Sequence, residues 1–258
     1  MKMFLLNGKH CTDINEFITC YNNQYYWMNK GYFAEKKIDT LLYEYESYDP
    51  KNIYFILAWK MAGLDIKNTN DLVNNTQENI YYYKNKGWIA NEFSGKNNGR
   101  PVDFSKIIET SVESSSARKE WMKKGFAEDE KGASDLLTNL ADTDTKEMGA
   151  VYYLTLLYFL TASRWPIYDQ FAYKAMCAIK NGKEPYIAHI DYSQRLPQKV
   201  KGKKYSEKLS PIVSENSVNQ YREYVKFIKD FEKELPEERR YTASRDIDRA
   251  LWVYGHLF

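Results

Sequence analysis

The sequence predicts a mostly α-helical protein that forms one compact globular unit of 258 residues, on three observations. Apolar side chains recur at helical spacing in most segments of the chain. Capping residues precede these segments, and Gly or Asn often follows them. The 43% apolar and 28% charged residues lie close to the averages of globular proteins. We therefore expect a single unit over residues 1–258, either undivided or built from two helical lobes, about 1–100 and 101–258, with a cleft between them.

The N-terminal part contains three helical patterns and one irregular segment. Asp13 precedes an apolar stripe at i, i+3, i+4 and i+7, and such a stripe behind a capping Asp predicts a first helix. A second helix is expected near residues 35–46. Residues 51–61 are unusually apolar and predict a core helix. Residues 87–99 mix Gly, Asn and Lys, so we expect irregular loop or a short strand there.

Further helices follow in the C-terminal part. Pro166 is expected in the first turn of one of them, because Pro is favoured at that place, and Asn181-Gly182 is expected to end it. By the same rules of spacing and capping, the helices are predicted at residues 103–124, 133–140, 146–162, 166–180, 215–234 and 242–256.

Composition indicates the compartment and excludes some classes of protein. The net charge is only +2, so any basic surface for nucleic acid must be local. The three Cys residues are scattered and make no disulfide framework, which favours a reducing compartment, and we expect the cytoplasm. The longest apolar run, residues 149–162, is shorter than the roughly 20 residues of a membrane span. We therefore expect no membrane association.

Several common catalytic motifs are absent from the sequence. There is no phosphate-binding glycine loop, no His-Glu-x-x-His and no Gly-x-Ser-x-Gly. Cys177 and His189 are a conceivable nucleophile pair, but Cys177 lies on the apolar side of a predicted helix, which favours a structural thiol. We expect no metal and no other cofactor.

The segment 146–172 is the best candidate for chemistry. A helix opened by Gly149 is followed by Pro166-Ile167-Tyr168-Asp169, which presents one carboxylate. Backbone N–H groups at the start of the first helix are suited to hold a phosphate. The charge of Asp169 is stabilised if it lies at the positive end of the next helix. The alternative is that Asp169 only caps or solvates that helix start.

Over about residues 146–179 the chain resembles the helix-hairpin-helix DNA glycosylase superfamily, in which a Gly-containing hairpin grips the DNA backbone and an Asp serves catalysis. The resemblance implies Gly149 as the hairpin glycine and Asp169 as the catalytic carboxylate. Two departures matter. The family's Gly-x-Gly pair is reduced to Gly149 alone, and no Lys stands just after it, at residues 151–153. The missing Lys argues against a Schiff-base lyase and in favour of monofunctional or lost activity.

The resemblance implies that one base is flipped out of the duplex into a pocket, where Asp169 stabilises positive charge developing on the sugar. Besides Asp169, the residues that flank the glycine and the carboxylate would contact the substrate: Gly149, Tyr152, Tyr153, Arg164, Trp165 and Tyr168. The alternative is that Trp165 packs in the core and that Arg164 is exposed to solvent.

A basic segment between residues 195 and 208 is a candidate for DNA phosphate contacts, although a solvated charge run is the commoner explanation of such a segment. Its candidate contacts are Lys199, Lys201, Lys203 and Lys204. We therefore expect a monofunctional DNA glycosylase-like protein of DNA repair or phage defence. The alternative is a non-catalytic helical module that binds nucleic acid or a protein.

Overall fold

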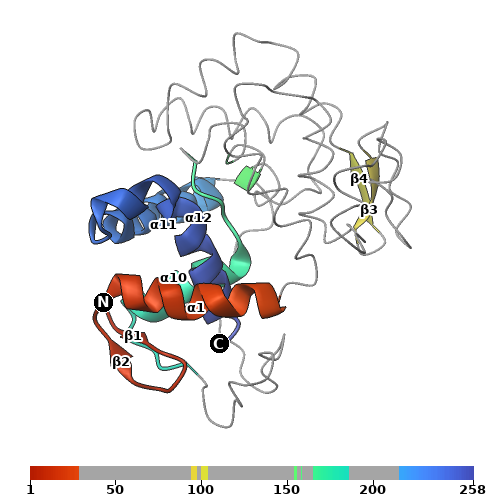
Figure 1. Cartoon of the computed structure of the whole chain (residues 1–258). Helices are drawn as coiled ribbons and strands as arrows, with labels where there is room; N and C mark the ends of the chain where they lie inside the picture. Colours follow the sequence, from red (N-terminus) through yellow and green to blue (C-terminus); the bar gives the residue numbers. More distant parts are fainter. Residues whose placement is uncertain (29–93, 98–99, 104–153, 156–157, 159–164, 186–214) are drawn as a thin grey trace, which may run out of the picture. The chain divides into compact units, whose positions relative to one another are not determined.

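The computed structural model describes residues 1–28, 94–97, 100–103, 154–155, 158, 165–185 and 215–258, and helix predominates among them (Figure 1). The prediction of a mostly helical protein is confirmed for these residues. Its elements are β1 (Met3–Phe4), β2 (His10–Cys11), α1 (Ile14–Met28), β3 (Ser94–Asn97), β4 (Arg100–Asp103), α10 (Gln170–Lys180), α11 (Glu215–Lys233) and α12 (Glu237–Gly255).

The chain divides into two compact units, and each unit draws on segments that lie far apart in sequence. The first unit contains Met1–Lys30, Pro166–Ser210 and Asn219–Phe258. The second contains Gly31–Trp165 and Pro211–Val218. Most of the described residues, including α1, α10 and α12, belong to the first unit.

A short antiparallel hairpin of β1 and β2 opens the first unit, with Met3 opposite Cys11. Gly8 closes its turn at φ 80°, in the left-handed region that Gly adopts without strain. The amide of Gly8 donates to Leu5 O at 2.9 Å. The hairpin is tied to α1 because the Tyr21 hydroxyl donates to Phe4 O at 2.8 Å.

The start of α1 confirms the prediction of a helix behind Asp13. The Asp13 carboxylate accepts hydrogen bonds from the amides of Asn15 at 2.8 Å and Glu16 at 3.3 Å. This cap satisfies two of the amide groups that a helix start leaves without an intrahelical partner. The predicted stripe is the buried face of the helix: Ile14, Phe17, Ile18 and Tyr21.

An aromatic core joins α1, α11 and α12 in the first unit. The ring centroid of Phe17 lies 5.1 Å from that of Tyr254 on α12 and 6.3 Å from that of Phe231 on α11. Tyr21 lies 5.1 Å from Tyr254. These three contacts are edge-to-face, an arrangement that the charge distribution of aromatic rings favours. In this unit α12 packs against both α1 and α10 (Figure 1).

The beginnings of two helices differ from the prediction. Pro166 is not in the first turn of α10, which begins at Gln170, because the Asp169 side chain caps the helix there. The helix α12 begins at Glu237, five residues before the predicted start, since it opens directly after Pro236 with two acidic residues in its first turn. The ends fit better: α10 stops at Asn181, followed by Gly182 at φ 62°.

Other predictions fall partly or wholly outside the described residues. Residues 94–97 and 100–103 form an antiparallel pair of strands, with Ser94 opposite Asp103, so Asp103 ends a strand instead of beginning a helix. Leu154, Thr155 and Tyr158 are helical and buried, as expected for the helix at 146–162. The helices predicted at 35–46, 51–61 and 133–140 lie outside the described residues. Among the helices that are described, none is long and apolar enough to span a membrane.

Candidate functional site

Asp169 is the N-cap of α10, and its carboxylate has a defined orientation. The residue has extended backbone angles, φ −136° and ψ 150°, and its Oδ1 accepts a hydrogen bond from the Phe171 amide at 3.0 Å. Its carbonyl oxygen accepts from the Tyr173 amide at 2.9 Å, the first bond of the helix. Asp169 is half-buried. A negative charge here is stabilised by the helix dipole and by the amide.

The three residues before Asp169 are anchored in the core. Ile167 is 2% exposed and Pro166 is buried. The Tyr221 hydroxyl of α11 donates to Pro166 O at 2.8 Å, which satisfies a buried carbonyl that no helix or strand uses. Asp169 therefore follows a backbone segment that is held in place from α11.

Tyr168 belongs to a cluster of buried tyrosines. Its ring lies 5.3 Å from Tyr221 and 5.4 Å from Tyr224, measured between centroids. All three side chains are fully buried. Burial raises the pKa of each hydroxyl well above its ordinary value, because the charged phenolate is disfavoured away from water. Tyr168, which the sequence proposed as a substrate contact, thus lies in the core next to the carboxylate.

A second aromatic group packs around Phe171 in the first turn of α10. The His256 ring stacks on Phe171, with centroids 3.6 Å apart and planes at 19°. Trp252 lies 4.2 Å from His256 and 6.1 Å from Phe171. Burial lowers the pKa of His256, and Lys174 lowers it further, while the Trp252 carbonyl and Asp169 oppose this. The imidazole is therefore mostly neutral near pH 7.

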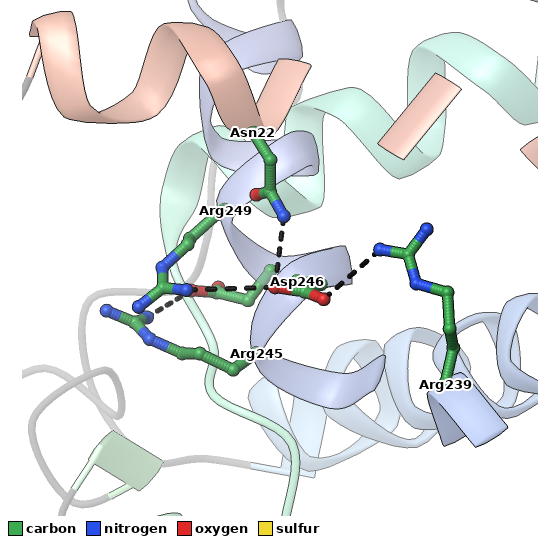
Figure 2. A network of polar contacts seen from close by, with 6 residues as sticks. Asn22, Arg239, Arg245, Asp246 and Arg249 are labelled. Carbon is green, nitrogen blue, oxygen red and sulfur yellow. Dashed lines mark hydrogen bonds and ion pairs between the residues drawn. The ribbon is translucent and has the colours of Figure 1, made fainter. Parts of the chain in front are cut away.

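A network of charged side chains centres on Asp246 of α12 (Figure 2). One carboxylate oxygen of Asp246 accepts from the Asn22 amide group at 3.0 Å and lies 3.7 Å from Arg249 Nη1. The other oxygen lies 3.3 Å from Arg239 Nη2. Asn22 is on α1, so this network connects α1 to the turns of α12 that carry Arg239 and Arg249.

The same helix carries a buried ion pair between Arg245 and Asp248, with 2.7 Å between Nη1 and Oδ2. Arg245 and Arg249 both lie over the Tyr25 ring of α1, 5.8 and 5.6 Å from its centroid. These are cation–π distances. Beside the aromatic contacts of Tyr254, α12 therefore carries buried charged side chains toward α1.

The prediction from the sequence lacks two parts of this site. It gave no role to His256, although its place one turn after Trp252 could have signalled contact between the rings. It also missed the ion pairs of α12, whose i, i+3 spacing of Arg and Asp is visible at residues 245–249. Neither signal shows which other helix the side chains face.

Of the remaining candidate residues, Trp165 is the one with a described placement. Trp165 is 3% exposed, which places it in the core, as the structural alternative for this residue supposed. The others lie outside the described residues: Gly149, Tyr152, Tyr153, Arg164, Lys199, Lys201, Lys203 and Lys204.

Cysteines and metals add nothing to the site as far as the structure describes it. Cys11, Cys20 and Cys177 form no disulfide, and the first and last are buried. Among the described residues, no group of three or more His, Cys, Asp or Glu side chains is placed to bind a metal.

Comparison with known proteins gives no further guide, because no family model, curated protein or solved structure matches the chain.

Proposed function

We propose that the protein is a helix-hairpin-helix DNA glycosylase-like hydrolase that removes a flipped base, with Asp169 as its catalytic carboxylate. One observation carries the proposal. The Asp169 carboxylate is held by the Phe171 amide at the positive end of α10, directly after a segment that is anchored in the core. A charge fixed in this way needs little reorganisation when a cation develops beside it.

The reaction would break the bond between the sugar C1′ and the base nitrogen. Asp169 stabilises the positive charge on the sugar and orients a water molecule, whose oxygen bonds to C1′ and whose proton passes to the departing base. Since the position after Gly149 carries no Lys, the reaction ends at an abasic site and proceeds through no covalent intermediate with an amine.

The three thiols, none of which forms a disulfide, support a reducing compartment, and we propose the cytoplasm.

The test measures abasic-site formation in duplexes that carry a panel of damaged or phage-type modified bases. Asn is as good an N-cap as Asp, so Asp169→Asn keeps the fold and removes the charge. We expect this variant to lose activity on the order of a hundredfold. Asp13→Asn is the matched control, because Asp13 caps α1 by the same kind of bond. Equal activity of wild type and Asp169→Asn would remove Asp169 from the mechanism.

A second candidate function is a non-catalytic helical module that binds nucleic acid or a protein. It is favoured by the same cap, since the bond from Asp169 to the Phe171 amide is by itself a sufficient reason for an Asp at this place. Absence of activity on every substrate, together with retained DNA binding, would select this candidate over the enzyme.

DNA binding is measured separately through its dependence on salt. Each phosphate contact adds about 0.9 to the slope of log affinity against log salt concentration. Replacing Lys199, Lys201, Lys203 and Lys204 by Gln should therefore flatten the slope if these residues contact the backbone. An unchanged slope would exclude them as phosphate contacts.

A further inference from the structure

The backbone of the last turn of α12 lies in direct contact with the backbone of the first turn of α10. A Cβ atom at Gly255 would lie 1.9 Å from Phe171 O and 2.5 Å from Phe171 C, so the two backbones are in contact at a distance that admits no side chain. Such an approach requires Gly. Phe171 is thus held at its backbone by Gly255.

The next residue of the chain holds Phe171 at its ring. His256 stacks on it, and its Nδ1 lies 2.7 Å from Trp252 O. A carbonyl oxygen only accepts, so Nδ1 carries the proton and the neutral ring has none on Nε2. This bond and the stack together fix the orientation of the imidazole.

Phe171 in turn holds the candidate carboxylate, because its amide donates to Asp169 Oδ1 at 3.0 Å. We propose that His256 is a positioning residue for Asp169 that acts through Phe171, an inference that rests on the proposed role of Asp169. The stack with His256 restricts the movement of Phe171, and the Phe171 amide orients the carboxylate. His256 itself need not touch the substrate.

This arrangement also makes the orientation of Asp169 sensitive to pH. Burial is the main reason that the pKa of His256 is lowered, and the charged groups that act on it from the described residues are Asp169 and Lys174. Lys174 also lies over the Phe171 ring, 5.3 Å from its centroid. A protonated imidazole is disfavoured at this buried position, so acid should loosen its contact with Phe171 and disturb the carboxylate.

The decisive measurement is the Phe171 amide signal in an NMR pH titration of the full chain. In wild type we expect it to shift with a midpoint below 6.5, the ordinary pKa of His. His256→Phe keeps the stack and should abolish the shift. His256→Gln removes the ring and should displace the signal at every pH. His10→Gln, which changes an exposed histidine in the hairpin, should leave the titration unaltered.

Two results would overturn the proposal. One is a Phe171 amide that does not titrate in wild type, and the other is a signal in His256→Gln that coincides with wild type above pH 7. Both are observed without substrate, so they remain decisive if no glycosylase activity is found and the proposed function fails. Where activity is found, His256→Gln should lower kcat on the order of tenfold with little change in KM, and His256→Phe should restore most of it.

Discussion

Arg245 and Asp248 of α12 form an ion pair across one helical turn, with 2.7 Å between Nη1 and Oδ2, and only 5% and 8% of their side chains are exposed. A charge pair this far from water is costly to create, but removing one partner is costlier still, since the other charge then stays buried without its counterion. Substitution of either partner of this pair should therefore lower stability strongly.

Asp248→Asn should therefore destabilise the fold by about 3–5 kcal/mol, measured as the free energy of unfolding in urea. Asp230→Asn is the matched control, because Asp230 pairs with Lys233 at the same i, i+3 spacing on an exposed surface. That pair should contribute less than about 0.5 kcal/mol. Similar losses in both variants would contradict a special role of burial.

Gly255→Ala tests the backbone contact between α12 and α10. The added methyl group would collide with the Phe171 carbonyl, whose atoms cannot rotate away as a flexible side chain can. We expect a loss of about 3 kcal/mol in unfolding free energy. Gly8→Ala, where the space is open but φ is 80°, should cost only about 1–2 kcal/mol. A smaller loss at Gly255 than at Gly8 would show that the contact is looser than described.

The sequence predicts a helix correctly where cap and stripe agree. Asp13 and the stripe behind it predict the start of α1, because the cap and the buried face both depend on nearby residues. For α10 the two signals conflict. Pro166 favours an early start, but its carbonyl accepts a hydrogen bond from the Tyr221 hydroxyl. The helix therefore begins only after the Asp169 cap. Which of two local signals prevails is decided by a distant helix.

The candidate site likewise has one feature that the sequence predicts and others that depend on contacts between distant residues. Asp169 at a helix start is visible from the Pro-x-x-Asp pattern alone. The role of His256 is not, since it depends on Phe171, and the role of Asp246 depends on Asn22 at the other end of the chain. Contacts between such distant residues follow from packing, and the spacing of residues in one sequence carries no information about them.

Two buried tyrosines should respond in opposite ways to loss of the hydroxyl. Tyr21 donates to Phe4 O at 2.8 Å, so Tyr21→Phe leaves a buried carbonyl without this partner and should cost about 1–2 kcal/mol. The Tyr224 hydroxyl is fully buried and has no hydrogen-bond partner in the described part of the chain. Tyr224→Phe should therefore be neutral or stabilising in urea unfolding. Equal destabilisation would indicate that Tyr224 does have a partner in the folded protein.

His256 should make the stability of the protein depend on pH. Its pKa is lowered in the folded state, so below about 6.5 the unfolded chain takes up a proton that the folded chain does not. The contribution of the neutral imidazole is thus complete above the ordinary pKa and is lost as pH falls toward the folded-state value. The loss reaches at most about 1.4 kcal/mol per pH unit for one proton.

Urea unfolding of wild type and His256→Phe from about pH 8 to pH 5 measures this contribution, because Phe keeps an aromatic ring against Phe171 and cannot titrate. Wild type should lose more stability than the variant over this range, and the difference should begin near the ordinary pKa of His. His10→Gln retains the buried imidazole and should follow wild type. Burial of the imidazole against Phe171 and Trp252 is the reason for this expectation. Parallel curves for wild type and His256→Phe would contradict it, because the imidazole would then be as easily protonated in the folded protein as in the unfolded chain.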